Sequence, residues 1–374
     1  MNMEPVTGAA PVNMGREASA QVSAGASSAR LYAPSWLDQT TRWIRRLPMP
    51  AWLFYLLLIL IFVFVETVPK WLDGTYPVGV LVPFHVVFAA TFAFTLAAHR
   101  YLIDSVGTVK PAFYTVFDGD ETKLESLLYQ LTTSPARPTL LWSLGAAGIA
   151  SLCWVVLGDS LPRYVLLSTS PLAATVDYLM MIVTWALIAA TASYCVHLIQ
   201  VLNYYLVRRA NIDIFKLGSL YAFSGLTGRV AVIFLLGNYI WYLTDPAPPD
   251  LSVWRAWRLV TTLAVALIAV GAFLCPLIGV HHVLELQKRR LLEQNAQRVR
   301  VVMSRVYHLL DSGESGDLVA LKNATDSLVA EQNTLEKLPT WPWHADTLRL
   351  VSTVLVLPLL AYLIERILAA VIGH

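Results

Sequence analysis

Long apolar runs recur along the chain and are separated by shorter polar stretches. An α-helix rises about 1.5 Å per residue, so roughly 20 apolar residues cross the hydrocarbon core of a bilayer. Seven runs have about this length: Ala51–Val68, Val78–Ala98, Thr139–Gly158, Ala173–Leu202, Leu226–Thr244, Leu259–Val280 and Thr347–Ile372. The pattern predicts an all-α polytopic membrane protein with seven transmembrane helices.

Residues 281–338, between the sixth and seventh apolar runs, have a helical pattern of their own and predict a hairpin that turns at 311–316. Apolar residues recur at three- and four-residue steps on the first arm, at Val299, Val302, Val306 and Leu309. The second arm has Leu318, Leu321, Leu328 and Leu335, which follow the same steps if Thr325 and Gln332 fill the gaps. These coiled-coil-like seams predict homo-oligomer formation through the hairpin. Trp341 and Trp343 follow it, as expected for aromatic residues at a membrane interface.

The chain therefore divides into four predicted parts. Residues 1–44 form a disordered cytoplasmic tail, because they are rich in Ala, Gly, Ser and Val. Residues 45–280 form the membrane domain, with a short amphipathic helix at about 118–133 in one of its loops. The hairpin at 281–338 and the seventh membrane helix at 339–374 complete the chain.

The distribution of basic residues predicts the orientation of these helices. If the N-terminus is cytoplasmic, 22 of the 27 Lys and Arg residues lie on the cytoplasmic side. Cytoplasmic segments of membrane proteins carry this excess of positive charge. The N-terminus and the hairpin are therefore predicted inside the cell, and the C-terminus outside.

Composition agrees with a multi-pass protein of the cell membrane, either a plasma or an inner membrane. Hydrophobic residues make up 56% of the 374 residues and charged residues only 14%, whereas soluble domains carry about 25% charged residues. The apolar composition predicts the lipid bilayer as a partner, and the net charge of +2 gives no global field that would favour nucleic acid. Cys153, Cys195 and Cys275 all lie in apolar stretches, so reduced thiols are expected.

No motif for enzymatic chemistry is found in the sequence. Phe223–Leu226 contains a serine and a glycine but lacks the preceding glycine of a nucleophile elbow. The acid–imidazole cluster of His281, His282 and Glu285 lacks the His-Glu-x-x-His order of zinc proteases, and a solvated helix surface is the other reading. The prediction is no enzyme, no cofactor and no metal site.

Polar residues inside the apolar runs are costly and therefore suggest function. Asp177, Thr184, Thr191 and Cys195 fall within about 40° of one another on a helical wheel. They form either an intramembrane polar pocket or a small-residue packing face. His85 and His197 either join this candidate pocket or form hydrogen bonds between helices.

One face of the seventh apolar run is apolar in the middle and polar at both ends. It consists of Ser352, Val356, Leu359, Leu363 and Arg366. Such a face suits a hydrophobic constriction in a symmetric pore, and it equally suits a helix packed inside the bundle.

The arrangement resembles the insect gustatory and odorant receptor-like superfamily. The shared features are seven spans with an internal N-terminus, extended helices on the cytoplasmic side, and a final span after a cytoplasmic helix. The resemblance implies a ligand-gated cation channel of four subunits, with the last helix lining the pore. The superfamily's Thr-Tyr…Gln-Phe signature is absent from the last span, where this chain has residues 360–366, so no residue role is carried over.

The sequence is consistent with three classes of function. The first is a sensor or ligand-gated channel that binds a small molecule between the outer halves of the helices. The second is a non-conducting scaffold whose hairpin docks a partner or a second copy. The third is a transporter or membrane enzyme, which the absence of internal repeats and catalytic motifs disfavours.

Overall fold

The fold is seen in a computed structural model, which describes residues 31–116, 121–157, 171–208, 214, 218–243, 252–312, 318–356 and 360. These residues form α-helices and no strand; an isolated bridge pairs Pro34 with Pro135. The helices are α2 (Trp36–Arg45), α3 (Ala51–Leu72), α4 (Pro83–Val116), α5 (Glu121–Thr132), α6 (Ala136–Leu157), α8 (Pro171–Arg208), α9 (Gly218–Leu243), α10 (Ser252–Ser312) and α11 (Leu318–Lys337). A further helical segment covers 345–356.

Five of these helices are long and apolar enough to cross a membrane. They contain the stretches Ala51–Leu72, Pro83–Tyr114, Pro171–Val207, Leu220–Ile240 and Val260–Asp311. The all-helical class is thereby confirmed. The third predicted span coincides with α6, which is not among the five, and the seventh lies partly outside the described residues. The count of seven and the orientation stay predictions.

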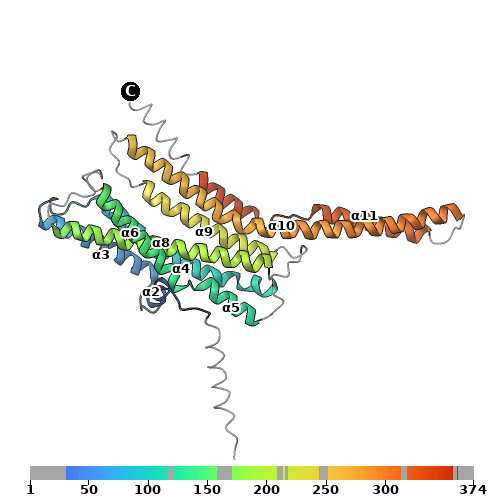
Figure 1. The fold of residues 1–374 in the computed structure, drawn as a ribbon, viewed down its shortest axis with the longest axis horizontal. Helices are drawn as coiled ribbons and strands as arrows, with labels where there is room; N and C mark the ends of the chain where they lie inside the picture. The colour runs from blue at the N-terminus through green and yellow to red at the C-terminus, as the bar shows by residue number, and fades with distance from the viewer. Residues whose placement is uncertain are drawn as a thin grey trace, which may run out of the picture.

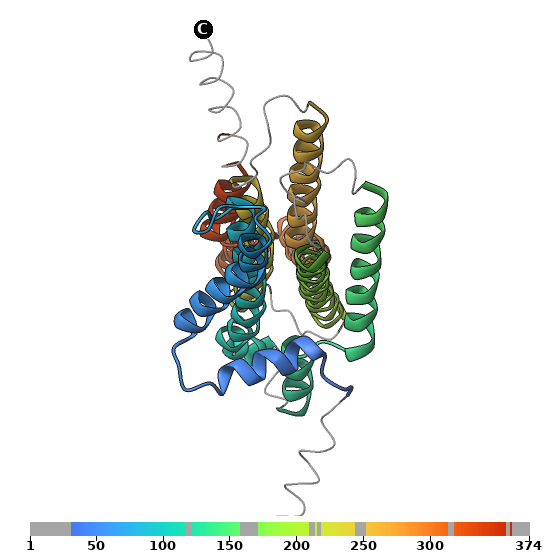
Figure 2. The ribbon, with the colours of Figure 1, turned by 90° about the vertical axis from the view of Figure 1, so that its left-hand side faces the viewer.

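The apolar surface of α3 is largely exposed, as a lipid-facing helix requires. Leu56, Leu60 and Phe64 are exposed, whereas Phe62 and Val63 are buried against Phe88 of α4. α6 lies at the edge of the bundle beside α8 (Figure 2). Lipid would cover such faces in a membrane, so their exposure in a single chain agrees with a membrane-spanning helix.

The largest buried cluster joins α4, α5, α8, α9 and α10 near the base of the hairpin. Phe113 of α4 meets Phe223 of α9 edge to face, with ring centroids 4.6 Å apart. Leu127 and Leu131 of α5 are fully buried in the same cluster. The predicted amphipathic helix in this loop thus corresponds to α5, which begins at Glu121 and packs its apolar face into the bundle.

The structure differs from the predicted disordered tail at residues 31–44. Ser35 and Asp38 form a capping box that starts α2, and Leu37 and Ile44 are buried against Leu96 of α4 and Leu187 of α8. The composition of the tail suggested disorder, but a capping box and an amphipathic face suffice to order its last turns.

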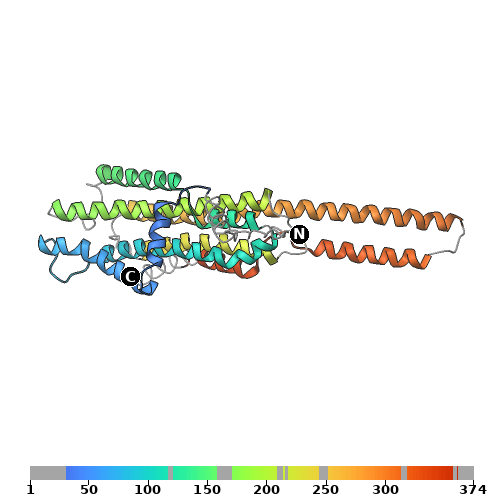
Figure 3. The same ribbon diagram turned by 90° about the horizontal axis from the view of Figure 1, so that it is seen from below.

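α10 and α11 extend beyond the other helices as a hairpin (Figures 1 and 3). Polar contacts hold the two arms together: Lys288 Nζ donates to the carbonyls of Glu336 and Leu338, at 2.7 and 2.9 Å, and Asn295 Nδ2 donates to the carbonyl of Leu328, at 2.9 Å. At the base of the hairpin, the ring of His281 stacks on Trp341 at 3.9 Å. The hairpin is therefore anchored at its base and along its length.

Candidate functional site

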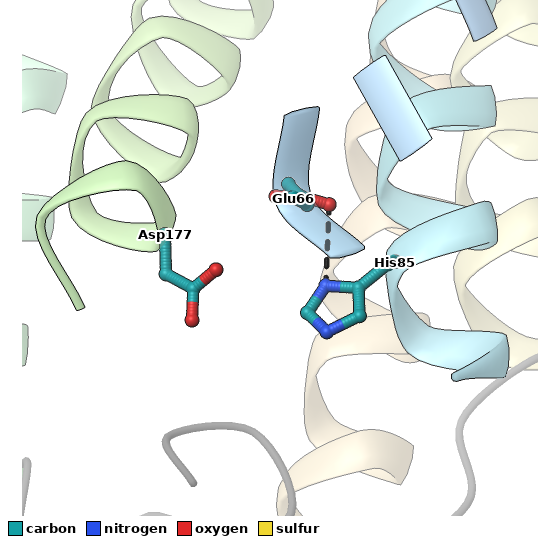
Figure 4. A group of neighbouring side chains, drawn as sticks. All are labelled: Glu66, His85 and Asp177. Carbon is teal, nitrogen blue, oxygen red and sulfur yellow. Dashed lines mark hydrogen bonds and ion pairs between the residues drawn. The ribbon is translucent and has the colours of Figure 1, made fainter. Parts of the chain in front are cut away.

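A cluster of four ionisable side chains lies between α3, α4 and α8, near the end of α3. Lys70 Nζ of α3 is 2.8 Å from Asp177 Oδ1 of α8 and 2.8 Å from His85 Nε2 of α4. His85 Nδ1 is 3.2 Å from Oε2 of Glu66, and Glu66 lies on α3 one helical turn before Lys70. Glu66 and His85 come from neighbouring helices, and Asp177 faces them from a third (Figure 4). We call these four residues the charged cluster.

The positions of the protons in the charged cluster follow from the donors and acceptors. An ammonium can only donate, so Lys70 donates to Asp177 Oδ1 and to His85 Nε2. His85 Nε2 must then be the acceptor nitrogen, and Nδ1 carries the proton that is donated to Glu66. A continuous hydrogen-bonded chain therefore runs from Asp177 through Lys70 and His85 to Glu66.

The charged cluster is buried and contains two acidic and two basic side chains. The residues are between 1% and 7% exposed. Two carboxyl groups, one amine and one imidazole share this site, and the hydrogen-bonded chain links all four. Burying ionisable groups is costly unless they are paired, so a cluster of this kind inside an apolar bundle indicates a site that takes up a cation or a proton.

A second polar cluster lies where the N-terminal segment crosses the helices. Asp38 Oδ2 accepts hydrogen bonds from the backbone N–H groups of Ser35 and Ser134, at 3.1 and 2.9 Å, and from their hydroxyls, at 2.8 and 3.1 Å. His99 Nε2 of α4 is 3.3 Å from Asp38 Oδ1. We call Asp38, Ser35, Ser134 and His99 the N-terminal clamp.

Opposing effects set the pKa of Asp38. Burial raises it, but the interaction with His99 and the hydrogen bonds from Ser35 and Ser134 together outweigh burial and hold the pKa below its ordinary value. The carboxylate form is therefore favoured at neutral pH, and it ties the start of α2 to the residues that precede α6.

Tyr32 extends this attachment to α8. Its hydroxyl donates to the carbonyl of Thr133 at 2.8 Å and lies 2.9 Å from His197 Nε2, which is itself 3.0 Å from the carbonyl of Gln130. A carbonyl only accepts, so His197 carries its proton on Nε2. Burial raises the pKa of Tyr32, with Tyr129 as a further cause, so the phenol stays neutral and can donate.

The residues of the candidate polar pocket are thus divided. His85 and Asp177 lie together in the charged cluster, whereas His197 bonds to Tyr32 and Gln130. Thr184 and Thr191 are buried on α8, and their hydroxyls have no hydrogen-bond partner among the described residues. These residues of α8 therefore take part in more than one polar contact.

Sequence reasoning missed Glu66 and Lys70, two of the four residues in the charged cluster. Both lie on an otherwise apolar helix and are four residues apart, so they share a face. Charged residues at this spacing in an apolar run were the available signal, since lipid-facing positions do not hold such pairs.

The predicted face of the last span is only partly described. Leu359, Leu363 and Arg366 lie outside the described residues. Ser352 and Val356 are exposed, whereas Val351 is buried in a cluster with Leu235 and Phe273 of α9 and α10. The pore or packing role of the Ser352 face therefore stays a prediction.

Among the other candidates, the His281 group is part of the hairpin base. His281 Nδ1 is 3.0 Å from the carbonyl of Thr340, and Glu285 pairs with Arg289. Cys195 is buried, and Cys153 and Cys275 are exposed free thiols.

Several long apolar helices, with a charged cluster buried between three of them, define the class: this is the architecture of an integral membrane protein. Comparison of the chain with protein-family models, with curated proteins and with solved structures found no match.

Proposed function

We propose that the protein is a membrane receptor in which an ion or small molecule engages the charged cluster and alters the position of the α10–α11 hairpin. The observation that carries this proposal is the buried chain of Glu66, His85, Lys70 and Asp177. Ionisable residues inside membrane helices are expensive, and they commonly mark binding sites or ion pathways. A purely structural bundle would gain stability from apolar residues at these positions.

A direct contact between α8, which carries part of the charged cluster, and α10 at the base of the hairpin supports the proposal. α8 carries Asp177 near its start, and near its end Asn203 and Val207 contact α10 at Gly279. A Cβ on Gly279 would lie 2.7 Å from Val207 Cγ2 and 2.9 Å from Asn203 Oδ1. The approach of α8 to α10 therefore depends on this glycine, and a shift of α8 would be felt at the base of the hairpin.

The finer form of the proposal is a ligand-gated channel that assembles through its hairpins, as the resemblance to the insect receptor superfamily implies. In that form, the last span lines the pore, and its face includes Ser352 and Val356, which are exposed in the single chain. Currents across a bilayer that contains the purified protein would test this form directly.

The receptor proposal is tested by a distance measurement between the bundle and the hairpin. Spin labels are attached at Glu125→Cys on α5 and Ser304→Cys on α10, both exposed positions, after replacement of the three native cysteines by alanine. Asp177→Asn removes one charge from the cluster and is expected to shift or broaden the distance distribution by a few ångströms.

Thr175→Val is the matched control, because Thr175 is exposed on the same helix two residues away from Asp177. It should leave the distance distribution unchanged. If Asp177→Asn also leaves the distribution unchanged in folded protein, the charged cluster is not coupled to the hairpin and the receptor proposal fails.

A scaffold is the second candidate, and one observation favours it. Met303, Tyr307 and Leu310 are exposed at four- and three-residue steps on α10, and Val319 is exposed near the start of α11. Such an apolar row on a helical hairpin is typical of surfaces that associate with another helix. A scaffold would form complexes through the hairpin and show no response to changes in the charged cluster.

A further inference from the structure

We propose that the charged cluster binds a divalent first-row metal ion of the zinc type, with His85, Glu66 and Asp177 as ligands, and that the ion replaces the Lys70 ammonium. This inference rests on the proposed receptor function and names the ligand of its site. The three residues each offer one ligand atom, and these atoms lie within 4.8 Å of one another.

The types of donor select the class of metal. An imidazole nitrogen with two carboxylate oxygens suits Zn²⁺ and its first-row neighbours, whereas Mg²⁺ and Ca²⁺ prefer oxygen ligands alone. The ligands come from α3, α4 and α8, so a bound ion would join the same three helices that the charged cluster links.

An unsatisfied acceptor provides a second, independent observation. The Asp177 side chain is only 8% exposed, yet its Oδ2 has no hydrogen-bond partner among the described residues, while Oδ1 accepts from Lys70. The carboxylate faces the His85 ring and Glu66 (Figure 4). A buried carboxylate oxygen without a donor is the group that a metal ion would satisfy.

The charge of the surroundings also favours a divalent ion. Asp73 at the end of α3 adds a third carboxyl group close enough to act on Asp177. A divalent ion would pair with more than one of these carboxyl groups, which a monovalent ammonium does less well.

The geometry requires a contraction and a movement of Glu66, which bonds to His85 Nδ1, whereas the position of Lys70 lies at His85 Nε2. Ligand atoms around a tetrahedral zinc lie about 3.3 Å apart, since Zn–N and Zn–O bonds are about 2.0–2.2 Å long. The three ligand atoms must therefore approach one another from separations of up to 4.8 Å. Lys70 Nζ stands between Asp177 and His85, so its departure opens the position that the ion takes.

The deciding variant is Lys70→Met, which removes the competing cation and keeps a long apolar side chain. Co²⁺ serves as the probe, because its visible absorption reports coordination, and Zn²⁺ displacement then gives the affinity. The detergent-solubilised full-length Lys70→Met protein is expected to bind at least about tenfold more tightly than the wild type, because a repelling positive charge is gone. Adding His85→Ala to this variant should abolish the binding.

His281→Ala with His282→Ala is the matched control, because these histidines lie at the base of the hairpin and could chelate metal on their own. The control should retain the tight binding. If Lys70→Met does not fold without metal, Zn²⁺ during extraction should rescue it, and Zn²⁺ should raise the unfolding temperature of the wild type but not of His85→Ala.

The metal proposal would be overturned if Lys70→Met bound metal no more tightly than the wild type, or if binding survived His85→Ala. It would also be overturned if Zn²⁺ neither rescued Lys70→Met during extraction nor raised the unfolding temperature of the wild type. These outcomes are separable from failure of the receptor proposal. If no metal binds but Asp177→Asn changes the hairpin distance, only the metal proposal is rejected. If metal binds but Asp177→Asn leaves the hairpin distance unchanged, the receptor proposal is rejected and the metal site remains.

Discussion

Asp38→Asn is expected to weaken the N-terminal clamp by several kilocalories per mole. Asp38 Oδ2 accepts four hydrogen bonds, two of them from the backbone N–H groups of Ser35 and Ser134. A hydrogen bond to a charged group contributes about 1.5–3 kcal/mol, and a neutral one about 0.5–1.5 kcal/mol. Each conversion to a neutral bond lowers the contribution by about 1–1.5 kcal/mol, so the two backbone bonds and one hydroxyl bond together should cost about 3–4.5 kcal/mol.

Asp104→Asn is the matched control. Asp104 pairs with Arg45 of α2, but its side chain is 53% exposed, and exposed pairs contribute only about 0–1 kcal/mol. The assay is the rate of trypsin cleavage after Arg45 and Arg46, which increases when α2 detaches from the bundle. Unfolding midpoints of the solubilised proteins give the global effect.

The pH dependence provides an independent check. Since the pKa of Asp38 is lower in the folded protein than its ordinary value of about 3.9, the stabilisation is complete above that value and is lost as the pH falls through the folded pKa. The difference between wild type and Asp38→Asn should be constant from about pH 5 to 8 and shrink below about pH 4. Equal cleavage rates for both aspartate variants at pH 7, or a difference that grows on acidification, would refute the reasoning.

Three further predictions concern packing, the hairpin and orientation. Gly279→Ala should destabilise by about 1–3 kcal/mol through overpacking against α8, whereas Gly271→Ala, with open space around its Cβ, should be neutral or stabilising; unfolding midpoints that move in the same direction would contradict this. Leu328→Asp places charge in the half-buried seam between α10 and α11 and should lower thermal stability and oligomer size, as size-exclusion chromatography would reveal. In intact cells, an impermeant thiol reagent should label Val78→Cys and leave Glu125→Cys protected, and the reverse result would invert the predicted orientation.

The helical fold could be predicted because its signal is local. Apolar runs set the helices, and their length sets which of them can cross a membrane. The start of α2 was also encoded locally, since Ser35 and Asp38 have the spacing of a capping box. The Ala- and Gly-rich composition of the preceding residues concealed that signal, because disorder is inferred over a window longer than one helical turn.

Only two of the four residues in the charged cluster were predictable, because a helical wheel gives the direction in which a side chain points but not its position along the helix axis. Asp177 and His197 are 20 residues apart on α8, which separates them by about 30 Å along the axis. One therefore joins the charged cluster, and the other joins Tyr32 and Gln130. Which side chain of α3 or α4 reaches Asp177 depends on how the helices pack, and that is fixed by contacts far apart in sequence.

The continuity of α10 has a mechanical consequence. This helix runs without a break for 61 residues, past Pro276, so one rod passes from the bundle to the tip of the hairpin. The part from Gly279 to Ser312 is about 50 Å long. A rotation of about 5° around Gly279 would sweep the tip through about 4 Å by the length of this arm alone. A rotation too small to rearrange the packing around Gly279 therefore produces a larger movement at the tip of the hairpin, which would change the contacts of a protein bound there.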